Sequence, residues 1–308
     1  PFNSVIQALD AETIYDVPLL MRKEKLDERV MERLKIPLKD EPTLDRWKEF
    51  LGRLKNPTKD VTIGLVGKYV ELHDAYKSIA EAFIHAGAQN ECKVNIQWIS
   101  SESIDEENVD SKLHTLDGIL VAPGFGERGL EGKITAARYA RENNIPFFGI
   151  CLGMQCAVIE FSRNVLGLTD ASSAELDPDS KHKVIDLMED QKNIKQMGGT
   201  MRLGSYPCDL KKGSKAYEAY GKQKITERHR HRYEFNDKYL KDMESKGMKA
   251  IGINPDSKLV EIVELKSHPW FIGVQFHPEL RSTVANPHPL FVGFVKAAIE
   301  FNRDRDNN

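Results

Sequence analysis

The sequence predicts an α/β fold: a doubly wound, mostly parallel sheet with added antiparallel strands, preceded by a short helical N-terminal segment. From residue 61 onward, apolar runs typical of buried strands alternate with segments of helical periodicity. This alternation is typical of a parallel sheet that is covered by helices on both faces. Strand-rich segments after residue 180 predict the antiparallel additions.

Residues 1–57 have a different sequence pattern from the rest of the chain. Apolar residues recur at helical spacing over 26–34 and 44–51, and prolines stand at positions 37, 42 and 57. These features predict short helices joined by connectors, because proline interrupts a helix. The stretch Lys-Asn-Pro-Thr at 55–58 is the expected boundary, so we expect a first segment at 1–57 and a main domain at 58–308.

The main domain is expected to begin with strands and helices in alternation. The predicted strands are 61–67, 93–99, 118–122 and 147–150, and the predicted helices are 75–88 and 133–144. Four later segments are expected to form the added antiparallel strands. They are 183–188, the region of 200–204, 259–265 and 270–276.

Composition excludes several classes of protein. The 308 residues carry a formal net charge of −3, which gives no overall basic field for nucleic acid. The longest apolar runs, 147–150 and 271–276, are far shorter than the ~20 residues that cross a bilayer. We therefore expect no nucleic acid and no membrane as a partner. The four cysteines match neither a zinc site nor a disulfide framework, and no signal peptide is visible, which predicts a cytoplasmic protein.

Cys151 stands where a predicted strand meets the start of a predicted helix. Gly149 and Gly153 flank it in a Gly-x-Cys-x-Gly pattern, the cysteine counterpart of the nucleophile elbow of hydrolases. Glycines allow backbones to approach closely around such a sharp turn. A helix N-terminus also favours the thiolate, which is the form that attacks carbonyl groups. The pattern predicts a nucleophile, although a cysteine packed between strand and helix would read the same way.

A glycine-rich segment at 123–129, Pro-Gly-Phe-Gly-Glu-Arg-Gly, directly follows a predicted strand, and we call it the glycine loop. Its Gly-x-Gly-x-x-Gly spacing makes a dinucleotide-binding oxidoreductase the first rival interpretation. That interpretation requires an acidic residue at the end of the next strand, where Ile150 and Cys151 stand. The phosphate-loop pattern fails as well, since Lys133 is followed by Ile134.

A different use suits the glycine loop better. The loop ends one strand and Cys151 ends the next, so the two are expected to face each other beyond the carboxyl edge of the sheet. A glycine N–H can then serve as an oxyanion donor beside the N–H of Leu152. Each donor of this kind is worth roughly 10²–10³ in rate.

His277 is the candidate base for such a nucleophile. It follows the apolar strand at 270–276 and precedes Pro278 and Glu279. Because proline forces an extended backbone, positions 277 and 279 are expected to project to the same side of the chain. A carboxylate there can hold the imidazole in one tautomer, as the third member of a catalytic triad does.

The stretch His-Arg-His-Arg at 229–232 is a small basic patch. In an extended conformation it places both histidines on one side and both arginines on the other. RNA binding is one interpretation, but no other basic cluster with interleaved aromatic residues is present. A single arginine aimed at a substrate carboxylate is the simpler one.

Taken together, these motifs resemble class I glutamine amidotransferases. They are GICLGMQ at 149–155, the glycine loop, and QFHPE at 275–279. Four further stretches are similar to the CTP synthase family: 64–78, 162–167, 197–204 and 227–234. The resemblance to this family runs from residue 4 to residue 301. The resemblance implies a flavodoxin-like domain that releases ammonia from glutamine through a Cys-His-Glu triad.

The resemblance also implies individual roles. Cys151 matches the nucleophile, His277 the base, and Glu279 the residue that orients the base. Gly124 and Leu152 match the oxyanion hole and so also contact the glutamine. The positions that hold the amino and carboxylate groups of glutamine match Gln155, Glu175 and Arg232, and contacts with a GTP-responsive lid at 197–204 match Phe125 and Arg202.

In this family the ammonia serves the ATP-dependent amination of UTP to CTP. The resemblance therefore implies that residues 1–57 are the end of the synthetase (amidoligase) domain with a linker, and that 58–308 are the glutaminase domain. It implies L-glutamine as the substrate and no cofactor in this chain. ATP and Mg²⁺ would belong to the synthetase domain of the same polypeptide, GTP would be an allosteric activator, and the full-length protein would be a homo-oligomer.

One departure from the family bears on the oxyanion hole. Many relatives have Pro-Gly-Gly-Phe-Gly where this chain has Ala-Pro-Gly-Phe-Gly at 122–126, so Pro123 replaces the first glycine. Proline donates no N–H and resists a peptide flip. Two alternatives stay open. Another cysteine hydrolase of the same fold would not need Glu175 and Arg232 to bind a free amino acid, and in a non-catalytic binding domain Cys151 would be unreactive.

Overall fold

A mixed sheet of nine strands forms the centre of residues 57–308, counted over the residues that the computed structural model describes, which are 4–37, 43–187 and 201–306. Its order is β2-β1-β3-β4-β12-β11-β10-β7-β8. The strands, in sheet order, are β2 (Cys92–Ser100), β1 (Lys59–Gly67), β3 (Gly118–Val121), β4 (Phe147–Ile150), β12 (Phe271–Val274), β11 (Val260–Leu265), β10 (Met248–Ile253), β7 (Arg202–Leu210) and β8 (Lys224–His231).

The five strands from β2 to β12 are parallel, and the pairs from β12 to β8 are antiparallel. The mostly parallel sheet with added antiparallel strands is thus confirmed. The direction of the strand at 270–276 was predicted wrongly. It was expected to be antiparallel, but it is parallel to β4 and pairs Phe271 with Phe147. All four residues of β12 are buried, as in a strand covered on both faces, and the long chain between β4 and β12 allows either direction.

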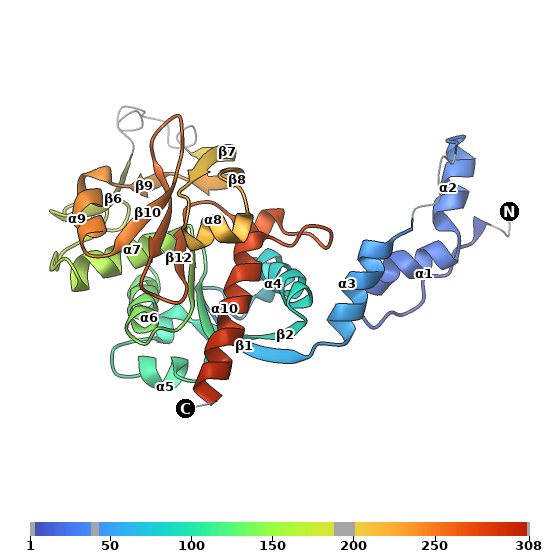
Figure 1. Cartoon of the computed structure of the whole chain (residues 1–308), viewed down its shortest axis with the longest axis horizontal. Helices are drawn as coiled ribbons and strands as arrows, with labels where there is room; N and C mark the ends of the chain where they lie inside the picture. Colours follow the sequence, from blue (N-terminus) through green and yellow to red (C-terminus); the bar gives the residue numbers. More distant parts are fainter. Residues whose placement is uncertain (1–3, 38–42, 188–200, 307–308) are drawn as a thin grey trace. The chain divides into compact units, whose positions relative to one another are not determined.

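Helices cover both faces of the sheet (Figure 1), as the alternation in the sequence predicts. One core lies under four helices: α5 (Val109–Leu113), α6 (Leu130–Glu142), α7 (Leu152–Asn164) and α9 (Leu240–Ser245). A second core lies under three: α4 (Lys77–Gln89), α8 (Lys215–Tyr220) and α10 (Pro289–Asp306). The aromatic residues Phe83, Phe148 and Phe291 pack edge to face in this second core.

A separate three-stranded sheet lies next to α7 and consists of β5 (Ser172–Ser173), β6 (Lys183–Leu187) and β9 (Tyr233–Phe235). The strand predicted at 183–188 therefore belongs to this small sheet, not to the main one. It pairs in parallel with β5 and antiparallel with β9. The expected lid at 197–204 is described only from residue 201, so residues 197–200 lie outside the described part.

The first 56 residues form a compact unit of their own. They contain α2 (Leu26–Leu34) and α3 (Asp45–Lys55), where the periodicity predicts short helices, and also α1 (Val17–Lys23), which was not predicted. Tyr15 is buried against Trp47 and Phe50, and the Trp47 indole N–H donates to the Tyr15 carbonyl at 2.7 Å. Within the described residues of the chain, no helix is long and apolar enough to cross a membrane.

Candidate active site

Cys151 occupies a sharp turn between β4 and α7. Its backbone has φ 52° and ψ −105°, a region that non-glycine residues rarely adopt, and its N–H donates to the Val274 carbonyl at 2.7 Å. Side chains at the two flanking glycines would not fit. A Cβ on Gly153 would lie 2.1 Å from the Val121 oxygen, and one on Gly149 would lie 2.7 Å from the Gly153 carbonyl. The Gly-x-Cys-x-Gly pattern therefore forms the predicted strand-to-helix elbow.

His277 and Glu279 lie at the carboxyl end of the neighbouring strand β12. Their side chains meet as predicted, with 2.7 Å between His277 Nδ1 and Glu279 Oε1. The predicted extended backbone is wrong, because Glu279 lies in a 3-10 helix, Pro278–Arg281, that begins directly after His277. Burial opposes a charge on the imidazole, but interactions with the Cys151 thiol and the Glu279 carboxylate outweigh it and raise the pKa of His277 to about 10. The imidazole is therefore protonated at neutral pH, beside the sulfur, which is the arrangement that activates a thiolate nucleophile.

The other three cysteines have no such surroundings. Burial raises the pKa of Cys92 to about 11 and that of Cys156 to about 12, and it raises the pKa of Cys208 further. A thiol that keeps its proton at neutral pH is a poor nucleophile. The thiol at the elbow is thus set apart from the other three by its contact with a charged imidazole.

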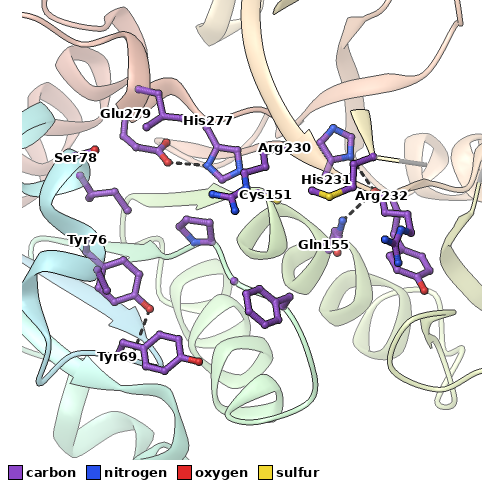
Figure 2. Close-up of a pocket in the computed structure, with 18 of the residues that line it drawn as sticks. Tyr69, Tyr76, Ser78, Cys151, Gln155, Arg230, His231, Arg232, His277 and Glu279 are labelled. Carbon is purple, nitrogen blue, oxygen red and sulfur yellow. Dashed lines mark hydrogen bonds and ion pairs between the residues drawn. The ribbon is translucent and has the colours of Figure 1, made fainter. Parts of the chain in front are cut away.

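A cavity of about 720 Å³ opens in front of Cys151, His277 and Glu279 (Figure 2). Figure 2 shows His277 between Glu279 and Cys151, with Gln155 and Arg232 farther along the cavity. Besides the triad, the cavity is lined by five residues that the sequence singles out: Gly124, Phe125, Gln155, Glu175 and Arg232. Leu152 is buried at the start of α7, directly after the nucleophile. Its backbone N–H is the expected second oxyanion donor.

Gln155 is held by two acceptors. Its Nε2 donates to the Tyr233 carbonyl at 3.2 Å and to Gln275 Oε1 at 3.2 Å. The amide of Gln275 in turn donates to Cys151 Sγ at 3.7 Å. Gln275 was not singled out from the sequence, although alternation along the strand places it on the same side as His277, two residues later.

Glu175 and Arg232 are side chains of opposite charge in the lining of the cavity. Glu175 Oε1 accepts from the Gly126 N–H at 3.4 Å, which links it to the glycine loop. Both Glu175 and Arg232 are near enough to Tyr233 to influence its pKa, which burial raises first of all. A carboxylate and a guanidinium in one cavity match the α-ammonium and α-carboxylate of a free amino acid.

The histidines and arginines of 229–232 alternate as expected for an extended segment. In β8 the side chains of His229 and His231 are buried and that of Arg230 is exposed. Burial first, and then an electrostatic interaction with His229, lowers the pKa of His231 well below its usual value. His231, Arg230 and Arg232 all contribute to the lining of the cavity, and His229 is buried beside Glu261, with 2.7 Å between His229 Nε2 and Glu261 Oε2.

Phe125 and Arg202, the expected lid contacts, have different surroundings. Phe125 lines the cavity with 74% of its surface exposed. Arg202 is buried and its guanidinium is engaged by two carboxylates, Glu234 Oε1 at 3.1 Å and Glu261 Oε1 at 2.8 Å. Its ion pairs tie β7 to β9 and β11, so the structure shows a bracing role for this side chain.

A metal site is not apparent in the described ranges 4–37, 43–187 and 201–306, where no group of three or more His, Cys, Asp or Glu residues could hold an ion. Cys151, His277 and Glu279 together bring a thiol, an imidazole and a carboxylate to a polar cavity. This set is suited to acyl transfer from an amide.

Comparison with known proteins identifies the class to which this site belongs. Residues 71–297 match the family model described as "Glutamine amidotransferase class-I". The chain belongs to the class I glutamine amidotransferase family, and the predicted fold class is confirmed. The resemblance seen in the motifs at 149–155 and 275–279 is thereby confirmed as well.

Within that family the chain is similar to CTP synthases. It is 70% identical to the CTP synthase of Cytophaga hutchinsonii over 303 residues, which are 98% of this chain and 56% of that protein. It is 61% identical to that of Christiangramia forsetii over 305 residues, 99% of this chain and 56% of that protein. A solved structure, the glutaminase domain of Trypanosoma brucei CTPS with bound acivicin, matches with a TM-score of 0.74 and 39% identity, covering 78% of this chain and 94% of that one. The chain thus spans little more than half the length of these curated relatives.

Proposed function

We propose that this chain hydrolyses L-glutamine to glutamate and ammonia through a thioester on Cys151. The observation that carries the proposal is that the elbow thiol shares one cavity with a His277–Glu279 pair whose Nδ1 and Oε1 lie 2.7 Å apart, and the pKa of this imidazole is raised to about 10. Glu175 and Arg232 in the same cavity supply the charges that a free amino acid requires. A peptide substrate would present no α-ammonium and α-carboxylate together at one residue.

The first half of the proposed reaction forms the thioester. Cys151 Sγ attacks the side-chain amide carbon of glutamine, and the electron pair of the C=O bond moves to oxygen. The N–H groups of Gly124 and Leu152 hold this oxyanion. When the C=O bond re-forms, the C–N bond breaks, and the His277 imidazolium gives its proton to the departing nitrogen, which leaves as ammonia.

The second half releases glutamate. A water molecule attacks the thioester carbon while His277, now neutral, accepts its proton. Collapse of this second tetrahedral intermediate breaks the C–S bond, which yields the γ-carboxyl group of glutamate and restores the thiolate beside the imidazolium. Glu279 takes no proton in this scheme, since its role is to hold the imidazole at Nδ1.

The test is glutamate release from glutamine by three forms of the chain. We expect Cys151→Ala to lower the rate at least 10³-fold, since no thioester can form. The matched control is Cys92→Ala, which removes a buried thiol at the start of β2, and its rate should stay within about twofold of the unsubstituted chain. Near-normal activity of Cys151→Ala would refute the covalent mechanism. Hydrolysis of peptides but not of glutamine would favour a different hydrolase.

We further propose the setting of this reaction in a longer protein. The CTP synthases to which the chain is similar support an assignment of 58–308 as the glutaminase domain and of 1–57 as the end of a synthetase domain with a linker. The ammonia would then serve an ATP- and Mg²⁺-dependent amination of UTP to CTP, with GTP as activator, in a cytoplasmic homo-oligomer. Glutamate release measured with and without GTP tests the activator, because an unchanged rate would contradict it.

A further inference from the structure

A fully buried lysine lies beneath the glycine loop. Lys133, on α6, has no exposed surface, and its Nζ donates to the Ala122 carbonyl at 2.7 Å. The same Nζ faces the Pro123 carbonyl oxygen at 3.5 Å. The two carbonyls that precede Gly124 are therefore both turned toward one ammonium group.

A second lysine holds the two carbonyls that follow Gly124. Lys68, just after β1, is 9% exposed, and its Nζ donates to the Phe125 carbonyl and to the Gly126 carbonyl, the latter at 2.9 Å. Together, Lys68 and Lys133 bind the backbone on both sides of Gly124. We call this pair the lysine clamp.

The clamp determines which way the Gly124 N–H points. The described residues contain no cis peptide bond, and in a trans peptide the C=O and the N–H point in opposite directions. Because the Pro123 carbonyl faces Lys133 in the interior, the N–H of Gly124 faces away from Lys133. A methyl group added to Gly124 would lie 3.5 Å from Lys133 Nζ, so the lysine also lies close to the residue that carries this expected oxyanion donor.

We propose that Lys133 is a positioning residue for the oxyanion hole: it fixes the Pro123–Gly124 peptide with its N–H toward the cavity before glutamine binds, and its charge favours the oxyanion. Lys68 fixes the following peptides in the same way. This inference rests on the proposed function. Pro123 resists a peptide flip, which raises the question of how the oxyanion hole forms. A loop held by the clamp requires no flip, because the Gly124 N–H already has its orientation.

A role in stability alone does not account for an ammonium group at this position. Burial is the largest influence on Lys133 and lowers its pKa to about 8, so the charged form is costly there. The titratable groups that face it are Cys156 and Cys151 from α7 and its N-cap, and Lys68 from the end of β1. A methionine of similar length would fill the same space without that cost, but it would leave the Ala122 and Pro123 carbonyls unbound.

The test compares the unsubstituted chain with Lys133→Met, and uses Lys296→Met, an exposed lysine on α10, as the matched control. Two probes separate the oxyanion hole from the thiol. The aldehyde analogue of glutamine adds the thiol to form a hemithioacetal whose oxygen occupies the oxyanion position. Iodoacetamide alkylates the Cys151 thiol without needing that position.

We expect Lys133→Met to lower kcat by about 10- to 100-fold with KM changed less than about threefold, and to weaken aldehyde binding by a similar factor. Alkylation of Cys151 by iodoacetamide should stay within about threefold, and Lys296→Met should match the unsubstituted chain. Aldehyde binding and kcat within about twofold of the unsubstituted chain would overturn the proposal. So would an equal loss of alkylation, because Lys133 would then act on the thiol.

A second variant keeps the proposal testable if Lys133→Met does not fold. We expect kcat of the unsubstituted chain to fall as pH rises through about 8, where Lys133 loses its charge. In Lys133→Arg the cation persists at high pH, so this fall should move upward by more than one pH unit. An unmoved limb would overturn the proposal. If the unsubstituted chain neither hydrolyses glutamine nor binds the aldehyde, the proposed function itself fails, and this inference fails with it.

Discussion

Replacement of Lys133 by methionine should change how the stability of the protein depends on pH. The ordinary pKa of a lysine is 10.5, and burial lowers that of Lys133 to about 8. In the unfolded chain this side chain therefore binds a proton more tightly than in the folded one. Where the unfolded state binds more protons, the free energy of unfolding rises with pH. Lys133 should thus weaken the fold at and below pH 8, and this effect should disappear as pH rises toward 10.5.

The magnitude follows from the difference between the two pKa values. Each pKa unit corresponds to 1.36 kcal/mol, so the full effect is about 3 kcal/mol. Between pH 7 and pH 9.5, about 2 kcal/mol of it should be lost. The hydrogen bond to the Ala122 carbonyl enters this comparison little, because a neutral amine also donates an N–H.

The assay is urea unfolding of the unsubstituted chain and of Lys133→Met, each at pH 7 and pH 9.5. We expect the free energy of unfolding of the variant, relative to the unsubstituted chain, to fall by about 2 kcal/mol between the two pH values. The Lys296→Met control should show no such change, since this lysine is exposed. A difference that stays constant within about 0.5 kcal/mol would refute the reasoning, because Lys133 would then titrate alike in both states.

Three further predictions concern the elbow and the triad. A diazo-ketone analogue of glutamine should label Cys151 and leave Cys156 free, and peptide mapping that finds the label mainly on Cys156 would contradict the nucleophile assignment. Glu279→Gln should retain a small residual rate of glutamate release, well above that of Cys151→Ala, because Glu279 orients His277 and does not react. Gly153→Ala should lower the melting temperature and abolish glutaminase activity, since its Cβ would lie 2.1 Å from a backbone oxygen; wild-type-like values would contradict the close contact.

The nucleophile and its base could be located from the sequence because each depends on a local pattern. The glycines around Cys151 identify the elbow, and the short spacing of His277 and Glu279 keeps the two side chains within reach, although through a 3-10 turn and not through the expected extended backbone. The structure brings these two segments together because β4 and β12 are neighbours in the sheet, pairing Ile150 with Val274. The proximity of the two segments was inferred because the Gly-x-Cys-x-Gly and His-Pro-Glu motifs occur in the same chain. Periodicity alone does not show whether β12 is parallel or antiparallel to its neighbours.

The parts that sequence reasoning missed depend on contacts between distant residues. Lys68 binds carbonyls 57 and 58 residues away, and no local pattern indicates such a partner. For Arg202 a role was predicted, but its observed surroundings differ. It was expected to contact a lid, and instead it donates to carboxylates 32 and 59 residues away. Charged side chains acquire their surroundings only when the fold is complete. Their roles are therefore harder to predict than those of glycine and proline, which act on their own backbone.

The elbow and the glycine loop both contact the end of β3. These contacts explain how the nucleophile and the oxyanion donor keep a fixed position relative to each other. Val121 pairs with Gly149 across β3 and β4, and the Val121 oxygen is also the atom that prevents any side chain at Gly153. The next residue, Ala122, accepts from Lys133. A shift of the elbow would therefore displace the strand end from which the glycine loop begins. Backbone contacts set the distance between the reacting groups, while the buried lysines set the orientation of the peptide that receives the negative charge.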